Sequence, residues 1–579
     1  MPLIHARRRL EVFLVRPSKY DDAGDLIQHW IGVLPSNTLA CLHALTEAVA
    51  RRWQDVDLRV EVRDEAVESL PLRRIRRAAR RRDTRVLVCL AGVQTSQLPR
   101  ARDLALRLRA SGIPVAIGGF HVSGSLLDGT PPAELVELEA HGVTLVAGEV
   151  EATWEALLRD AADGRLRPRY DTLAARPDLA TAPIPRFPAR ALRRFVRGGF
   201  ATLDTSRGCP YACSFCTIIR VQGRTSRQRD PDLVARHVRD EHQRSGAHHY
   251  FFTDDDLARN PRWPELFERL AEVRRDGRVP LRFLMQADLR AHAIPGFVDA
   301  ARRAGCFQVF LGLESLDAES LRAAGKRQNR VDDYRTAIAA WQQANILVHV
   351  GYIVGFDSDT PESVRTSVDL LKHELQVDVA SFFMLTPLPG SADHRDLAER
   401  RAALDTDLNR YDTFHAVREH PRMTHPEWES LYREAWHRFY TPEHLSARLA
   451  ATAPELRPTL LQVYLWYLAT FRVQGAHPML TGFLRRKPRR ERRPGSEPRS
   501  AVGHAGRRVV ETGREIAGYA GVLRDLYSAW SALPDESSGT PLERAASFAR
   551  ALRGGTPRST TMASALPAAH AYAKRSPTR

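Results

Sequence analysis

Cysteine is scarce in this sequence, with six residues in a chain of 579, and their spacing does not form a disulfide framework. Small secreted domains stabilised by disulfides are therefore excluded. The composition suits a reducing compartment, so we expect a cytoplasmic protein. Three of the cysteines, Cys41, Cys89 and Cys306, stand alone in apolar or mixed runs. Isolated cysteines of this kind usually behave as small buried hydrophobic residues.

Long apolar runs are also missing. The most apolar later stretch, residues 460–468, contains Gln462 and is far shorter than the ~20 residues that span a bilayer. The amino terminus carries basic residues beside a short apolar run that is typical of a strand, and it lacks the apolar core of a signal peptide. We therefore expect no membrane span.

Lysine is rare as well, contributing five of the 86 basic residues in a chain of net charge +17. The positive charge is unevenly placed, because residues 485–579 hold 19 Lys and Arg against 8 Asp and Glu, which accounts for +11. The basic tract at residues 485–495 is typical of a solvated tail or linker, and contact with nucleic acid or an anionic surface is the less favoured alternative. Nucleic acid is therefore not an expected partner.

The length calls for more than one domain, because a single core rarely grows beyond ~250–300 residues. The first 165 residues alternate short β-rich runs with amphipathic stretches, which predicts an α/β domain with a doubly wound parallel sheet, of the Rossmann-like type. The predicted strands are residues 12–15, 58–62, 86–89, 115–117 and 144–146.

Ligands of such sheets bind beyond the carboxyl ends of the strands. At those ends this sequence places Gly118, Gly119 and His121, and further on the run Gly148-Glu149-Val150-Glu151. Glycines there allow a ligand to approach the backbone closely, although ordinary turns use them too. For His121, a loop histidine bonded to the backbone is nearly as good an explanation as a contact with a ligand.

A second domain follows a Pro- and Arg-rich linker, residues 166–199. Strands recur with a helix between each pair, which predicts a partial (β/α)6 barrel over residues 200–400. Residues 401–484 are predicted to form a helical extension, in which the amphipathic stretch 425–445 is a lid or packing layer. Residues 485–579 are predicted to hold a basic linker, a helix at 511–530 and a disordered tail from Pro557. The six barrel strands are expected at residues 200–204, 249–253, 281–285, 308–313, 347–354 and 377–384.

Three cysteines form the densest motif of the chain. Cys209, Cys213 and Cys216 follow the first predicted barrel strand with the spacing C-x3-C-x2-C. Thiolates are the usual ligands of iron–sulfur clusters, and three of them leave one iron of a four-iron cubane open to another ligand. A structural zinc site is the alternative, but it normally needs four ligands, often as two C-x2-C pairs, and the sequence has no second pair.

Polar residues gather where the predicted barrel strands end, and in β/α barrels that end carries the active site. Besides the cysteines they are Asp254, Asp255, Asp256, Gln286, Asp288, Glu314, Ser315, Asp357 and Thr386.

At this point the sequence resembles the radical S-adenosylmethionine (radical SAM) enzymes, whose three-cysteine loop is matched by Cys209, Cys213 and Cys216. The segments FFTDDDLARN, LGLES, VGYIVGF and TPLPGS strengthen the resemblance. When the doubly wound first domain is included, the chain resembles the branch of radical SAM enzymes that carries a cobalamin-binding domain. This resemblance covers roughly residues 10–440. A D-x-H-x-x-G segment, which supplies a histidine ligand to cobalt in other cobalamin proteins, is missing. Cobalamin binding therefore stays open, and histidine ligation of the cobalt is disfavoured.

The resemblance implies roles for individual residues. The three cysteines would hold a catalytic [4Fe-4S] cluster, and one residue of the Asp254–Asp256 run would bind the SAM ammonium group, unless these aspartates cap a helix. The loops of the first domain would face the corrinoid through Gly118, Gly119 and His121. The remaining candidate SAM contacts are Phe215, Gln286, Glu314, Ser315, Gly351 and Gly355. The alternative for Gln286 is a place in the barrel lining, and the alternative for Glu314 and Ser315 is the start of the next helix.

Four arginines flank the cysteine loop. They are expected to stabilise an anionic cluster or a substrate carboxylate, with surface ion pairs as the equal alternative. The four are Arg207, Arg224, Arg227 and Arg229.

The expected reaction is reductive cleavage of SAM to methionine and a 5′-deoxyadenosyl radical that attacks a small organic substrate, with methyl transfer to carbon through cobalamin. A radical rearrangement, oxidation or cyclisation is the first alternative, and a non-catalytic module that binds an iron–sulfur cluster and SAM is the second. A one-electron reductant such as flavodoxin or ferredoxin would be the protein partner.

Metal content tests the cysteine loop. Anaerobic reconstitution should give a brown protein with roughly four irons per chain, as one cubane requires. Elemental analysis and the absorption spectrum measure this. Stoichiometric zinc without iron would contradict the cluster.

Overall fold

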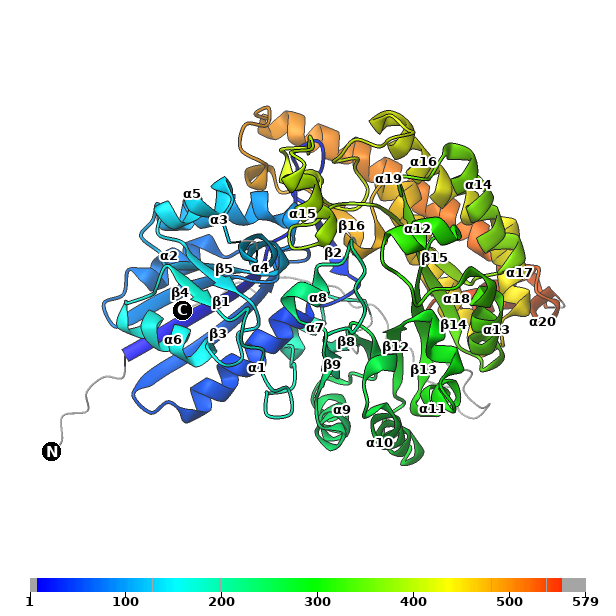
Figure 1. Cartoon of the computed structure of the whole chain (residues 1–579), viewed down its shortest axis with the longest axis horizontal. Coiled ribbons are helices and arrows are strands. Elements are labelled where there is room, and N and C mark those ends of the chain that lie inside the picture. Colours follow the sequence, from blue (N-terminus) through cyan, green and yellow to red (C-terminus); the bar gives the residue numbers. More distant parts are fainter. Residues whose placement is uncertain (1–7, 128, 197–199, 481, 538, 554–579) are drawn as a thin grey trace, which may run out of the picture.

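The computed structural model describes residues 8–553, except residues 128, 197–199, 481 and 538. The predicted disordered tail from Pro557 lies outside these residues. Two parallel six-stranded sheets dominate the molecule, one in each half of the chain (Figure 1). None of the helices in the described parts of the chain is both long and apolar enough to cross a membrane.

The first sheet has the order β3-β1-β4-β5-β6-β7 and is parallel throughout. Side chains of β1 alternate between two cores: Leu10, Val12 and Leu14 point to one, Phe13 and Val15 to the other. This period of two is what a sheet covered on both faces requires. The predicted doubly wound domain is confirmed. Its strands are β1 (Arg8–Arg16), β3 (Val56–Asp64), β4 (Thr84–Leu90), β5 (Val115–Gly118), β6 (Thr144–Ala147) and β7 (Arg169–Asp171).

Helices cover both faces of this sheet. Residues of α1 (Asn37–Arg52) and α6 (Trp154–Asp163) share the core with Leu10, whereas α2 (Leu72–Ala79), α3 (Leu98–Arg109) and α5 (Ala133–Ala140) share the core with Phe13. The short helix α4 (Phe120–Leu126) begins directly after β5.

The second sheet has the order β15-β14-β13-β12-β11-β8, also parallel, which confirms the predicted partial barrel. Local signals set the helix ends: α9 (Pro231–Ser245) starts at the cap Asp230, whose side chain accepts from the Asp232 amide, and stops at the left-handed Gly246. The strands are β8 (Phe200–Leu203), β11 (His249–Phe252), β12 (Arg282–Ala287), β13 (Cys306–Glu314), β14 (Leu347–Val354) and β15 (Val379–Met384), and the other helices between them include α10 (Trp263–Arg275), α11 (Phe297–Ala304), α12 (Ala318–Ala323), α13 (Tyr334–Gln343) and α14 (Pro361–Asp369).

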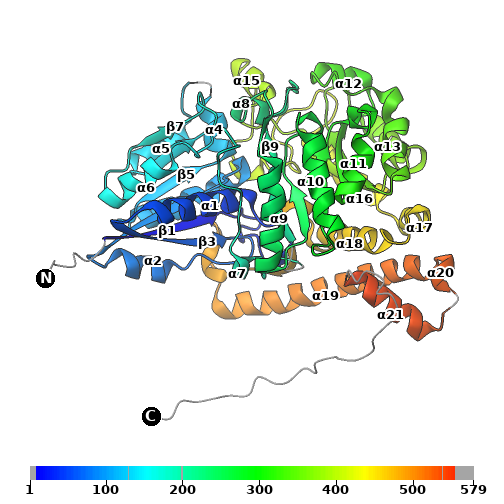
Figure 2. The same cartoon turned by 90° about the horizontal axis from the view of Figure 1, so that it is seen from below.

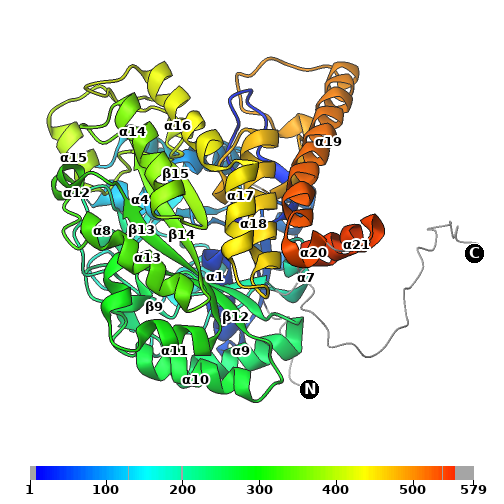
Figure 3. The same ribbon diagram turned by 90° about the vertical axis from the view of Figure 1, so that its right-hand side faces the viewer.

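The amphipathic stretch 425–445 forms two helices rather than one, α16 (His425–Phe439) and α17 (Pro442–Ala451), because Pro442 cannot continue the first helix. Trp428 and Trp436 of α16 belong to the barrel core, so α16 is a packing layer. Figure 3 shows α17 and α18 (Arg457–Leu468) beside the barrel strands. The predicted helix 511–530 lies within α19 (Ala501–Ser531), the long helix along the edge of the molecule in Figure 2, and α21 (Pro541–Leu552) follows it.

Two features of the fold differ from the sequence prediction. Strand β7 lies inside the predicted linker and extends the first sheet to Asp171. The carboxyl-terminal segment also returns to the first domain, because β16 (Gly482–Arg486) pairs antiparallel with β2 (Gln28–Gly32). A partner more than 450 residues away leaves no signal in a local pattern.

The basic tract 485–495 is not a solvated tail. Arg485 binds Asp21 at 2.9 Å, and the nearly buried Asp25 accepts hydrogen bonds from Arg492 at 3.0 Å and Arg499 at 2.8 Å. Lys487 lies 3.8 Å from the same carboxylate. The positive charge that suggested solvent exposure is thus matched by acidic side chains of the first domain. We call these ion pairs between residues 485–499 and the first domain the carboxyl-terminal latch.

The latch predicts the effect of Asp25→Asn. Burial opposes ionisation of Asp25, but Arg499, Lys487 and Arg492 outweigh it and hold its pKa below the ordinary value. The substitution should lower the free energy of unfolding by on the order of 2 kcal/mol at pH 7. Because the pKa is depressed, this contribution is present above the unfolded value of about 4 and is lost as the pH falls below it.

Denaturant unfolding of the two proteins at pH 7 and pH 3.5 measures the difference. Glu497→Gln, an equal charge change at an exposed position of the same segment, should have little effect. Equal losses from both variants would contradict the latch.

Candidate active site between two cavities

The three cysteines lie in the loop between β9 (Ser206–Arg207) and α8 (Ile218–Val221), directly after β8. Gly208 enters this loop with φ of +99°, and a Cβ there would lie 2.3 Å from the Thr225 carbonyl oxygen, so no other residue fits. The Cys209 amide donates to the Gly223 carbonyl at 3.2 Å. The loop is thereby fixed at the carboxyl end of the barrel, where the sequence predicted it.

Burial disfavours ionisation of the three thiols. It raises the pKa of Cys209 to about 12 and that of Cys216 to about 11, and it raises the pKa of Cys213 as well. Thiolates at these positions therefore need cations beside them, which a metal centre supplies. The side-chain amide of Gln328 donates to the Cys213 sulfur at 3.7 Å, a contact that would stabilise a thiolate ligand.

The positions of the sulfur atoms argue against a single zinc ion. With a Zn–S bond of about 2.3 Å, two sulfurs on one zinc lie at most about 4.6 Å apart. Within the described residues, the one group of three metal-ligating side chains whose ligand atoms all lie within 4.8 Å of one another is Asp230, Asp232 and Glu265. The three sulfurs are spread more widely, as the several metal atoms of a cluster require. The residues present fit an iron–sulfur cluster.

The three aspartates after β11 have separate surroundings. Both carboxylate oxygens of Asp254 are occupied, accepting from the Thr205 amide at 2.9 Å and from the hydroxyls of Thr205 and Ser206 at 2.6 Å. Its side chain is fully buried, and burial raises its pKa to about 6 against these hydrogen bonds. Asp254 therefore fixes the strand that enters the cysteine loop and is not placed as a free SAM ligand.

Asp255 and Asp256 lie closer to the loop. Asp255 accepts from the Gly208 amide at 2.7 Å, and burial raises its pKa to about 7. Burial and the neighbouring Asp288 raise the pKa of Asp256 well above its ordinary value. Arg259, which binds Asp288 at 2.5 Å, supplies the nearest positive charge.

Glu314 ends β13 with φ of +67°, a left-handed conformation that is strained for a residue with a side chain. Its carboxylate binds the ammonium group of Lys326, which also lies 5.9 Å from the ring centre of Phe215. Burial would lower the pKa of Lys326, but Glu314 outweighs it and raises it. The pair places Glu314 beside the cysteine loop, where the sequence expected a cofactor contact.

Lys326 was missed by the sequence analysis. A signal existed, because a chain that uses arginine at nearly every basic position keeps a lysine twelve residues after Glu314.

Three predicted SAM contacts have other neighbours. Ser315 is buried, and its hydroxyl accepts from the Asp317 amide at 3.0 Å in a local turn. A Cβ on Gly351 would meet the Phe310 ring at 2.7 Å, and one on Gly355 would meet Trp428 at 2.0 Å. Both glycines thus make room for aromatic rings of the protein itself.

A cavity of approximately 680 Å³ fills the barrel below the cysteine loop. Phe215, Gln286, Glu314 and Thr386 line it at the carboxyl ends of the strands. The Gln286 side chain also donates to the Asp254 carbonyl at 3.0 Å. These predicted rim residues are therefore brought together around one space.

A second cavity, of approximately 180 Å³, lies at the carboxyl ends of the first sheet. Gly118, Gly119 and Gly148 line it, and a Cβ on Gly119 would lie 2.2 Å from the Val93 amide nitrogen. His121 is not among its lining residues, since its ring is buried in α4 with Nδ1 3.3 Å from the Thr95 hydroxyl. The glycines face the cavity as predicted, and the histidine does not.

Arg207 lines the cavity of the first sheet and joins the two domains. This buried guanidinium binds Asp204 at 2.9 Å, Glu149 at 2.7 Å and Glu151 at 2.6 Å. Burial alone would raise the pKa of Asp204, but Arg207 and Arg229 bring it to about 2. Three of the four predicted arginines, Arg207, Arg227 and Arg229, bind buried carboxylates of the protein itself, whereas the exposed Arg224 donates to the Pro210 carbonyl. A role of these arginines beside a cluster stays a prediction.

Comparison with known proteins agrees with this arrangement. Residues 203–371 match the family model of the Radical SAM superfamily. The chain is 28% identical over 336 residues to bacteriochlorophyllide d C-12(1)-methyltransferase of Chlorobaculum tepidum, covering 57% of this chain and 69% of that protein. It is 24% identical over 356 residues to hopanoid C-2 methylase of Rhodopseudomonas palustris, covering 61% and 64%.

Two solved structures share the arrangement of both domains. One is the radical S-adenosylmethionine methyltransferase TsrM from Kitasatospora setae with cobalamin and a [4Fe-4S] cluster, with a TM-score of 0.57, 18% identity, and coverage of 79% of this chain and 95% of that chain. The other is the cobalamin-dependent radical enzyme OxsB with aqua-cobalamin, with a TM-score of 0.54, 12% identity, and coverage of 93% and 83%. Residues 203–371 therefore form a radical SAM domain, and the fold of the chain is similar to the folds of these two proteins.

Proposed function

We propose that this protein is a cobalamin-dependent radical SAM methyltransferase that transfers a methyl group to a carbon of a small organic substrate. One observation carries the proposal: the cysteine loop separates two cavities. Arg207, Val221 and Gln222 of this region line the cavity of the first domain, whereas Phe215 lines the cavity of the barrel. A cofactor and a substrate on opposite sides of the loop would both reach it.

The chain's own residues would bind and orient the reactants. Cys209, Cys213 and Cys216 would hold a [4Fe-4S] cluster, which when bound and reduced supplies the electron that cleaves SAM. Glu314 and Gln286 line the cavity beside Phe215, and Asp255 is a further acidic group close to the loop. We assign the SAM ammonium group to this acidic rim.

The glycine-lined cavity of the first domain would receive the corrinoid. Gly118, Gly119 and Gly148 let a flat ring approach the backbone, and Arg207 holds the Glu149–Glu151 loop against the cluster loop. His121 is turned away from this cavity, which agrees with a cobalt that takes no histidine ligand from this chain. We place the reaction in the cytoplasm, with flavodoxin or ferredoxin as the one-electron reductant.

Cofactor chemistry tests the proposal directly. Reconstituted protein incubated with SAM and dithionite should release 5′-deoxyadenosine and take up about one hydroxocobalamin per chain. Cys213→Ala should abolish nucleoside release, while Cys306→Ala, which removes a buried thiol far from the loop, should retain it. Chromatography of the nucleoside and the corrinoid absorption spectrum are the measurements. Release of 5′-deoxyadenosine without corrinoid uptake would overturn methyl transfer and leave radical chemistry without cobalamin.

The substitution Glu314→Gln tests whether the acidic side chains beside the cysteine loop bind the SAM ammonium group. Loss of one carboxylate that pairs with Lys326 and faces SAM should raise the SAM concentration at half-maximal 5′-deoxyadenosine release about tenfold, the effect of one charge-assisted hydrogen bond. Asp333→Asn, the same change at an exposed carboxylate, should leave it unchanged. A fall in maximal rate with no change in SAM dependence would contradict the assignment.

A further inference from the structure

The size and lining of the barrel cavity indicate which kind of molecule it can bind. Its approximately 680 Å³ falls within the range of about 300–1,000 Å³ typical of small-molecule sites. Barrels of this kind usually fill their interior with layers of bulky side chains. Here Gly312 and Gly351, paired on adjacent strands, bring no side chain of their own, and the Phe310 ring lies beside Gly351. The described residues leave part of the barrel interior open instead of filled.

The walls of the cavity are mainly apolar. Five inward-facing positions of the strands carry large apolar side chains, and α18 closes the space with three more. Among the described residues, the acidic side chain in the lining is Glu314, already paired with Lys326, and the basic side chains are Arg553, His249 and His349. An occupant with a large apolar body gains from this burial, and a strongly charged one does not. The apolar positions are Phe251, Leu284, Phe310, Ile353, Phe383, Val463, Leu465 and Trp466.

Several polar side chains also line the cavity, and four of them form one hydrogen-bonded group. Nε2 of His349 lies 2.9 Å from the Ser381 hydroxyl, which lies 3.0 Å from the Tyr467 hydroxyl, and the Gln308 amide lies 3.2 Å from Nδ1 of His349. All four residues line the cavity. Burial lowers the pKa of His349 to about 3, so the group is neutral near pH 7. It offers hydrogen bonds without charge, which suits a hydroxyl or carbonyl group.

The polar group and the cysteine loop lie at opposite ends of the cavity. Phe215, the neighbour of Cys216, packs near Ile353 of β14. His349 precedes Ile353 by four residues on the same strand, which corresponds to about 13 Å along a parallel strand. A molecule held at His349 would therefore present a carbon about 13 Å away to the loop.

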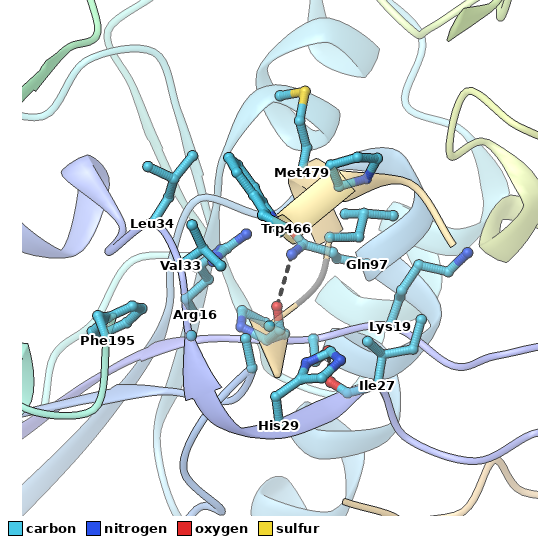
Figure 4. Close-up of a pocket in the computed structure, with 17 residues that line it drawn as sticks. Arg16, Lys19, Ile27, His29, Val33, Leu34, Gln97, Phe195, Trp466 and Met479 are labelled. Atoms are coloured by element: carbon cyan, nitrogen blue, oxygen red, sulfur yellow. Dashed lines mark hydrogen bonds between the residues drawn. The ribbon is translucent and has the colours of Figure 1, made fainter. Parts of the chain in front are cut away.

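An apolar rim leads to the cavity. A small hollow at the junction of the domains, approximately 30 Å³ and large enough for one water molecule, shares Val33, Leu34, Trp466 and Met479 with the large cavity (Figure 4). Met479 is 59% exposed, so this lining side chain lies between the cavity and the solvent.

We infer that the substrate is an elongated, uncharged, mainly apolar molecule with one hydroxyl or carbonyl group, which Ser381, Tyr467 and His349 hold at the end of the cavity away from the cysteine loop. The carbon that reacts lies about 13 Å from that oxygen, in the apolar part of the molecule. The claim that this molecule is the substrate rests on the proposed function. The claim that the cavity binds such a molecule rests on the cavity alone.

Displacement of a neutral apolar dye tests the binding. Full-length, cluster-reconstituted protein is titrated with 1-N-phenylnaphthylamine, and the dye is then displaced with 1-decanol, decanoate or decyltrimethylammonium below their micelle concentrations. We expect 1-decanol to displace the dye at a concentration at least tenfold lower than either charged analogue. Equal displacement by decanoate would overturn the assignment of an uncharged polar end.

Two variants locate the site. The double variant Ser381→Ala with Tyr467→Phe removes two hydroxyls with little change of shape. It should weaken 1-decanol about fivefold to tenfold and leave dye binding within twofold. Val463→Trp should fill the cavity and weaken the dye at least tenfold, whereas Val509→Trp, the same change at an exposed position of α19, should not. Unchanged 1-decanol affinity in the double variant would overturn the role of the polar group.

The two hypotheses fail separately. Release of 5′-deoxyadenosine from the same preparations, without selective binding of 1-decanol, would contradict the substrate class and leave the proposed function intact. Selective binding without nucleoside release would contradict the function. Circular dichroism and iron content show whether Val463→Trp folds, and the double variant keeps the test decisive if it does not.

Discussion

Arg207 is the side chain on which the arrangement of the active site depends. It lies one residue before the glycine that begins the cysteine loop, and its guanidinium is shared by Asp204 of the barrel and by Glu149 and Glu151 of the first domain. Arg227 binds Glu149 and Arg229 binds Asp204, so three arginines face three carboxylates in one network, and removing any member leaves an uncompensated charge. The loop, the barrel strand and the first sheet are therefore fixed relative to one another by electrostatics as well as by packing.

This constraint explains why the aspartates after β11 divide their tasks. Asp254 uses both oxygens to hold Thr205 and Ser206, the two residues just before Arg207, and Asp255 holds the amide of Gly208 just after it. Burial raises the pKa of both carboxyl groups, and the hydrogen bonds that they accept partly offset this rise. The sequence predicts that one of these aspartates binds SAM, and in the structure Asp254 and Asp255 support the cysteine loop.

The sequence predicted much of this molecule, because the decisive signals are local. Alternating runs located the parallel strands, glycines marked the ends of β5 and β6, and three cysteines identified the loop. The failures concern partners distant in sequence. The basic tract looked solvated because its acidic partners, Asp21 and Asp25, lie more than 450 residues away. Gly351 and Gly355 looked like contacts for a cofactor because no pattern reveals that Phe310 and Trp428 occupy the space beside them. Lys326 was overlooked because its role follows from Glu314, not from its neighbours.

The position of the cysteine loop has a consequence for how the two cavities can work together. A radical formed in water would be quenched, so a reaction of this kind needs walls that exclude solvent on both sides of the loop. The two cavities are walled by opposite means: the glycines of the first sheet leave backbone open to one cavity, whereas Phe310, Phe383 and Trp466 surround the other with apolar bulk. A rigid joint between the domains is needed to align them, and the buried charges of Arg207 supply it. The same ion pairs that stabilise the fold therefore set the distance across which the reactants meet.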